Sequence, residues 1–134
     1  MFDQGHLSSF STQGPRLGVP AVADDGRVFR YVKAGATALV VGNLQQASAE
    51  KTNHQNLTAP VAAIGATSVA VTLGATEAQA NDYAEGFMVV TVTPGVGYQY
   101  RIKSHPAAAA SASLTLTLED PIEVALTATS RPPA

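Results

Sequence analysis

Residues 87–104 read FMVVTVTPGVGYQYRIKS, two strand-like runs joined by turn residues. In the second run Tyr98, Tyr100 and Ile102 lie at every other position, and polar or charged residues lie between them. A period of two is typical of a β-strand with one buried face. The stretch therefore predicts an antiparallel hairpin whose Tyr98, Tyr100 and Ile102 side chains are packed.

The first run of this hairpin, residues 87–93, carries apolar side chains on both faces. A strand that is apolar on both faces is typical of the interior of a sheet. We therefore expect this run to be a central strand. The glycines of the G-x-G sequence at Gly95 and Gly97 are expected to serve the geometry of the turn, because glycine readily adopts a positive φ.

Strand-like runs also lie on either side of this hairpin. The sequence TSVAVTLG, residues 67–74, places its larger apolar residues on one face. The sequence SLTLTLEDPIEVALTAT, residues 113–129, alternates in the same way before and after Asp120 and Pro121, which predicts a second hairpin. Shorter strands are predicted at residues 28–32, 37–41 and 60–64.

These turn-punctuated strands predict an all-β fold, an antiparallel β-sandwich or a small β-barrel. Residues 1–26 are rich in Gly, Ser, Gln and Pro and are interpreted as an extended N-terminal arm. Such an arm either lies along a neighbouring subunit or is a frayed terminus. We assign the β domain to residues 27–129 and a C-terminal tail to residues 130–134, where the sequence SRPPA cannot continue a ladder.

The surface of this chain is expected to be poor in charge. Charged residues make up 13% of the sequence and the formal net charge is -2, whereas about 25% is usual for soluble domains. A weakly charged surface is typical of a protein whose surface is covered by partners. No cysteine is present, which excludes disulfides and thiolate chemistry. We find no signal peptide and no membrane-spanning run, so no membrane partner is expected.

Catalytic and cofactor motifs are absent from the sequence: it contains no nucleophile elbow, P-loop or dinucleotide-binding motif. The histidines His6, His54 and His105 lie far apart and are expected to be solvated. The acidic residues fit turns better than a carboxylate pair or a calcium site. We therefore predict no enzyme activity, no cofactor and no metal. The acidic candidates are Asp24, Asp25, Glu119, Asp120 and Glu123.

Arg101 and Lys103 are the first candidates for contact with a partner. Alternation places them on the face opposite Tyr98 and Tyr100, so the cations and the rings do not share a face as they do in a nucleic-acid-binding sheet. We therefore expect no nucleic acid, and an acidic patch on a neighbouring protein as the alternative contact. Arg16 and Arg27 are further candidates for partner binding.

The chain from about Gly18 to Leu126 resembles a group of structural proteins of tailed bacteriophages. The phrase G-x-x-Y-x-I-K-x-H-P, which begins at Gly97 and ends at Pro106, and the Ala-rich connector after it recur in that group. The resemblance implies a virion component, of the capsid cement or decoration type, on the capsid surface. It also implies that the major capsid protein is the partner and that the chain forms a homo-oligomer, a trimer or a dimer.

Many members of that group continue into another β-rich module, whereas this chain stops at Ala134. Two other functions stay open. A tail, fibre or host-surface module that binds carbohydrate would use the loops at residues 45–56 and 75–86. A glycan hydrolase would depend on the acidic residues between 119 and 123.

Overall fold

The computed structural model describes residues 11–40, 42–58 and 60–128, and every regular element in these residues is a β-strand. The predicted all-β class is confirmed. None of the described residues forms a helix with the length and apolar character needed to cross a membrane. The chain divides into two compact units, residues 1–49 and residues 50–134, and we describe each unit by itself.

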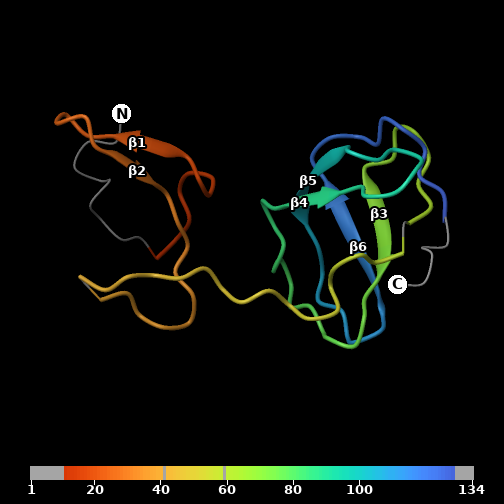
Figure 1. The fold of residues 1–134 in the computed structure, drawn as a ribbon, viewed down its shortest axis with the longest axis horizontal. Helices are drawn as coiled ribbons and strands as arrows, with labels where there is room; N and C mark the ends of the chain where they lie inside the picture. Colours follow the sequence, from red (N-terminus) through yellow and green to blue (C-terminus); the bar gives the residue numbers. More distant parts are fainter. Residues whose placement is uncertain (1–10, 41, 59, 129–134) are drawn as a thin grey trace. The chain divides into compact units, whose positions relative to one another are not determined.

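The first unit contains an antiparallel hairpin of β1 (Pro20–Val22) and β2 (Val28–Arg30) (Figure 1). Asp25 shapes the turn, because its carboxylate accepts a hydrogen bond from the Arg27 backbone N–H at 3.1 Å. Gly26 follows with a φ of 83°, in the left-handed region that glycine tolerates best. The interpretation of Asp25 as a turn residue is confirmed.

Part of the predicted N-terminal arm is a β-strand, since β1 lies within residues 1–26. The arm was expected to run to residue 26, whereas β1 pairs with β2 on the other side of that position. Residues 1–10 of the arm lie outside the described residues. Whether the arm lies along a neighbouring subunit stays a prediction.

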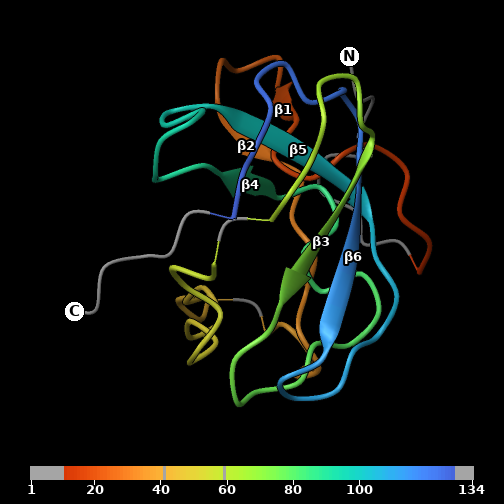
Figure 2. The same ribbon diagram turned by 90° about the vertical axis from the view of Figure 1, so that its right-hand side faces the viewer.

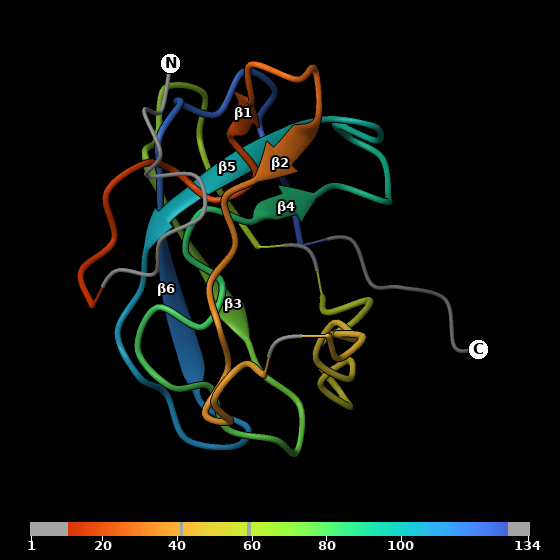
Figure 3. The same cartoon turned by 90° about the vertical axis from the view of Figure 1, so that its left-hand side faces the viewer.

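The second unit is built on a curled antiparallel sheet with the strand order β3-β6-β5-β4 (Figures 2 and 3). The predicted hairpin at residues 87–104 is confirmed as β4 and β5, with Met88 opposite Tyr100. The bounds of the strands are β3 (Ser68–Thr72), β4 (Phe87–Val89), β5 (Gln99–Ser104) and β6 (Ser113–Leu118).

The core lies on one face of this sheet and follows the alternation of the sequence. In β6 the leucines are buried and the residues between them are more exposed. Burying a leucine or isoleucine side chain contributes about 1.5–3 kcal/mol, so these alternating side chains are the main stabilising contribution. Buried side chains from the sheet are Val69, Val71, Tyr100, Ile102, Leu114, Leu116 and Leu118.

A β-bulge in β5 changes which face its last residues occupy. Ile102 lies opposite Leu118, but Ser104 lies opposite Thr117, so the register shifts between Ile102 and Ser104. An extra residue in one strand reverses the alternation beyond it. His105 is consequently buried, with 4% of its surface exposed.

The predicted second hairpin at residues 113–129 is wrong. β6 pairs with β3 and β5, so both of its sides are occupied. After Pro121 the chain instead crosses to another segment, where Ile122 N–H donates to the Ala66 carbonyl at 2.9 Å. Ala62 and Leu126 then form an isolated antiparallel bridge. Ile122 and Leu126 are buried as the alternation predicted, but against the end of the core and not in a ladder with β6.

Three other strand predictions also need correction. β4 is an edge strand of the sheet and not a central one. Residues 37–40 form no strand in the described part of the chain, and Val41 lies outside it. The strand predicted at residues 60–64 is reduced to the single bridge at Ala62. A local pattern specifies a strand's faces but not its neighbours, which depend on the rest of the fold.

The turn between β4 and β5 confirms the role predicted for its glycines. Gly95 and Gly97 have φ values of 87° and 90°. A Cβ atom added at Gly95 would lie 3.0 Å from Leu126 Cδ2, whereas one at Gly97 would meet nothing within 4 Å. Both glycines therefore serve backbone conformation, and Gly95 also allows close packing.

Candidate binding surface

β4 has a hydrogen-bonded neighbour on one side only, since β5 is next to it and no further strand follows in the described part of the chain. Val90 N–H donates to the Tyr98 carbonyl at 2.9 Å, and Ile102 N–H donates to the Gly86 carbonyl at 2.9 Å. In an antiparallel ladder the alternate residues direct their N–H and C=O groups away from that neighbour. Phe87 and Val89 therefore direct theirs to the open side. We call residues 87–92 the β4 edge.

The outer face of the β4 edge is apolar and exposed. Phe87 and Val89 are 56% and 51% exposed, although soluble proteins usually protect edge strands with charge, proline or a bulge. Phe87 lies opposite Arg101 and Val89 lies opposite Gln99, so these side chains share one face of the sheet.

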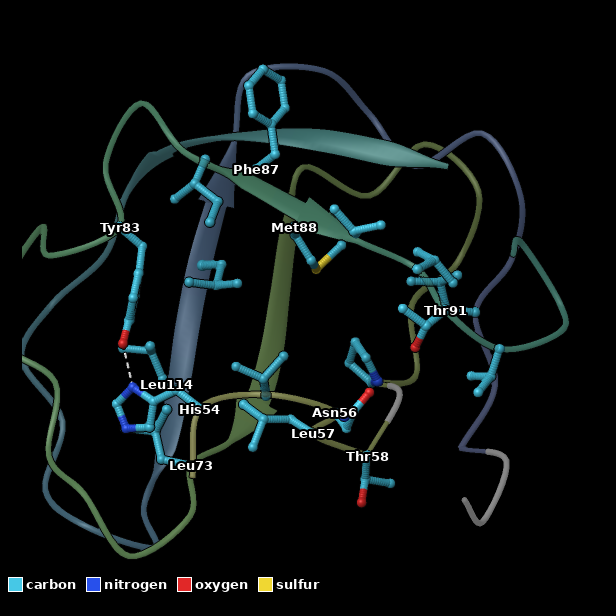
Figure 4. Close-up of a pocket in the computed structure, with 18 residues that line it drawn as sticks. His54, Asn56, Leu57, Thr58, Leu73, Tyr83, Phe87, Met88, Thr91 and Leu114 are labelled. Carbon is cyan, nitrogen blue, oxygen red and sulfur yellow. Dashed lines mark hydrogen bonds between the residues drawn. The ribbon is translucent and has the colours of Figure 1, made fainter. Parts of the chain in front are cut away.

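A cavity of about 230 Å³ lies beside the β4 edge, within the second unit. Figure 4 shows Met88 pointing into it, Phe87 pointing away from it, and His54 and Leu57 on the opposite side. Its floor is formed by core side chains of the sheet. Most of the lining is apolar, and these lining residues include Leu57, Val71, Leu73, Met88, Val90, Ile102, Leu114, Leu116 and Leu126.

Polar side chains form a network at one end of the cavity, around Tyr83. The His54 Nε2–H donates to the Thr76 carbonyl at 2.8 Å, which leaves Nδ1 to accept from the Tyr83 hydroxyl (Figure 4). The Tyr83 ring also stacks on the ring of His105 at 5.4 Å. These partners use both ring nitrogens of His54, so the network orders the loops and leaves little free hydrogen-bonding capacity.

His105, the residue directly after β5, completes the network. Its Nε2 accepts the Tyr83 backbone N–H at 3.0 Å and its Nδ1–H donates to the Pro106 carbonyl at 2.8 Å. The expectation of solvated histidines is wrong for His105, because the bulge turns this residue inward, and it is wrong in part for half-buried His54. His6 lies outside the described residues.

An ion pair between Lys51 and Asp82 lies next to Tyr83. The hydrogen bond from Lys51 lowers the pKa of Asp82, with help from the Gln79 backbone N–H at 2.7 Å. The same hydrogen bond raises the pKa of Lys51. Burial raises the pKa of Tyr83, so its hydroxyl stays protonated and donates to His54 at neutral pH.

Of the two cations predicted on β5, Lys103 is exposed and Arg101 is partly covered. Arg101 Cζ lies 5.6 Å from the centre of the Phe87 ring, and Arg101 Nε lies 3.8 Å from the Glu119 carboxylate. Arg101 therefore interacts within its own chain. Tyr98 is 39% exposed, so the expectation that it is packed is wrong, because it lies at the end of the β4–β5 turn, before β5 begins at Gln99.

Arg16 and Arg27 belong to the first unit and are exposed. The Arg27 Nε donates to Asp25 at 2.6 Å, and its Cζ lies 5.5 Å from the centre of the Phe29 ring. The structure thus distributes the four predicted contact residues over two units. Their role toward a partner stays a prediction.

The acidic candidates do not gather into a metal site: no group of three or more His, Cys, Asp or Glu side chains suited to a metal ion occurs in the described residues. Asp25 binds Arg27, and Glu119 lies beside Arg101.

The sequence pattern alone does not place Phe87 and Val89 on a surface. The signal was present, since residues 87–93 are apolar on both faces. A central strand and an edge strand covered by a partner produce the same pattern.

Comparisons of the chain with known protein families, with curated proteins and with solved structures find no match in any of the three.

Proposed function

We propose that this chain is a structural protein of a tailed-bacteriophage virion that cements the capsid. It binds the capsid exterior, with the major capsid protein as its partner, and stabilises the contacts between capsid subunits as a homo-oligomer. The resemblance over residues 18–126 supports this proposal, and so does a surface suited to association.

The observation that carries the proposal is the β4 edge. Its outer face exposes Phe87 and Val89, and its backbone groups on the open side are available to another strand. An exposed edge of this kind favours association with another chain. A cement protein needs such a surface, because its task requires buried area and not bond chemistry.

The low charge of the chain fits the same task. With 13% charged residues, little charge has to be desolvated when faces of the domain are covered. Lys103, exposed on the strand next to β4, offers a cation at the rim of the association surface. Contacts repeated over many copies multiply a modest affinity for each copy.

Localisation of the protein on purified virions tests the proposal. Cryo-EM reconstruction, or immunogold labelling, is expected to place it on the outer capsid surface at regular positions between capsomers. Density or label confined to the tail would contradict the capsid assignment.

A second candidate function is a carbohydrate-binding module of a tail, fibre or host-contact protein. The observation in its favour is that His54 and Tyr83, from the two loop regions predicted for this role, lie together at the cavity. A glycan array with the purified protein tests it. Selective binding that is lost in Tyr83→Ala but kept in Val61→Ala would support this candidate over the cement function.

A further inference from the structure

The second unit contains a sheet edge beside which the described residues place no further strand. The β4 edge is flanked by a cavity of about 230 Å³ with a mostly apolar lining. A dry apolar cavity of roughly 150 Å³ is enough to hold a benzene-sized group. A strand added beside β4 would direct alternate side chains toward this cavity and the remaining side chains toward the outer face of Phe87 and Val89.

The first unit contains a strand-like segment that has no sheet. Residues 37–40, with the sequence TALV, begin and end with a β-branched residue and are otherwise apolar. In the described part of the chain they form no ladder, and Leu39 and Val40 are 55% and 60% exposed. The Val40 carbonyl accepts a bond from Asn43 N–H at 3.3 Å. This is the predicted strand for which the described residues provide no pairing at all.

These two features complement each other chemically. Neither residues 37–40 nor residues 87–92 contain a charged residue or a proline, so pairing would bury no unpaired charge and would leave no ladder position without an N–H. In a paired strand, alternate side chains of the segment would face the cavity of about 230 Å³. These would be either Thr37 and Leu39 or Ala38 and Val40, and both sets consist of small or medium-sized side chains.

We propose that residues 37–40 of one copy of this chain add as a strand to the β4 edge of a second copy. Every copy carries both the segment and the edge. Repetition of the contact therefore links copies either reciprocally, in a dimer, or head to tail, in a ring. The inference rests on the proposed cement function and specifies the contact through which the homo-oligomer forms.

Disulfide cross-linking between two variants tests the contact, and the chain provides a clean background because it contains no cysteine. Leu39→Cys and Val89→Cys are prepared separately, with a mass tag on one of them, then mixed and mildly oxidised. Both positions are more than half exposed, so both variants are expected to fold. Thr91→Cys provides a second position on the edge.

The mixed disulfide is expected to form at least about tenfold faster than in a control mixture, because a specific contact raises the local concentration toward the millimolar range. The control mixture combines Val28→Cys with Val61→Cys, at positions that are 60% and 74% exposed. A series of variants with one cysteine at position 37, 38, 39 or 40 is then cross-linked to Val89→Cys. We expect strong and weak cross-linking to alternate along this series, because successive side chains of a strand point to opposite faces.

A rate equal to that of the control mixture would overturn the inference. So would a double variant, Leu39→Cys with Val89→Cys, that closes its disulfide within one chain at a rate independent of protein concentration. The assay uses purified protein without capsids. Capsid binding without this cross-link would therefore contradict the strand-to-edge contact but not the proposed cement function. The cross-link without capsid binding would contradict the cement function but not the contact between copies.

Discussion

His105 uses both of its ring nitrogens, and through Nε2 it links the segment after β5 to the loop that precedes β4. It is 4% exposed, accepts the Tyr83 N–H and donates to the Pro106 carbonyl. We expect His105→Phe to lower the free energy of unfolding by about 1–3 kcal/mol, because the ring is kept but two polar groups lose their partner. Urea unfolding measures this loss. Lys103→Phe, at an exposed position, is the control, and equal effects of the two substitutions would contradict the assignment.

The Lys51–Asp82 pair makes a pH-dependent contribution to stability. The pKa of Asp82 is lowered in the folded state by the Lys51 hydrogen bond. Its contribution is therefore present above the usual Asp pKa of about 3.9 and is lost as the pH falls through the lower folded value. We expect Asp82→Asn to cost about 0.2–1 kcal/mol at neutral pH, as is usual for partly exposed pairs.

Urea unfolding across the acidic range checks this prediction. The difference in unfolding free energy between the unsubstituted protein and Asp82→Asn is expected to shrink as the pH falls below the usual Asp pKa and through the lower folded value, because the carboxylate then becomes protonated in both states. Asp120→Asn, at an exposed turn residue, serves as the matched control. A difference that persists unchanged into acid would show that the ion pair is not its source.

At the scale of the elements, two glycines of the β4–β5 turn allow the cost of backbone strain to be distinguished from the cost of a packing clash. Gly95→Ala and Gly97→Ala both place a side chain at a positive φ, which costs about 1–2 kcal/mol. Only Gly95→Ala also meets Leu126, at 3.0 Å. We expect Gly95→Ala to be the more destabilising of the two in thermal and urea unfolding. Equal losses would mean that the hairpin does not pack on Leu126 as described.

The alternation in the sequence predicted the faces of several strands correctly. Val69 and Val71 in β3 and the leucines of β6 point inward as expected. The alternation could not predict partners, because pairing depends on segments that are distant in sequence. The chain after Pro121 bonds to Ala66 and Ala62 and does not return along β6.

The candidate surface was harder to predict than the core. One bulged residue between Ile102 and Ser104 moves His105 from the outside to the inside, and nothing in the local sequence marks the bulge. Met88 and Val89 were recognised as apolar on opposite faces, but the position of β4 at the sheet edge decides that Val89 is exposed. Arg101 lies on the face of β5 opposite Tyr100, as predicted. Its side chain contacts Phe87 and Glu119 of the same chain.

At the scale of the whole molecule, each unit exposes apolar side chains or strand-like backbone that the described residues of that unit do not cover. The second unit has a core, a polar network and the apolar β4 edge. The first unit has a small hairpin and exposed apolar side chains that include Leu39 and Leu44. The low charge and the exposed apolar surface support the proposal that the chain is one component of an assembly.

Rebinding of purified protein to virions stripped of it is the central test of the proposed cement function and of the β4 edge as its contact surface. We expect saturable binding at a fixed number of copies per capsomer. Val89→Lys, which places a charge on the β4 edge, is expected to bind at least about tenfold more weakly, since oligomers bind through many contacts. Val61→Lys, at a site 74% exposed outside that edge, is expected to bind like the unsubstituted protein. Absence of saturable binding, or equal binding by Val89→Lys, would contradict the account.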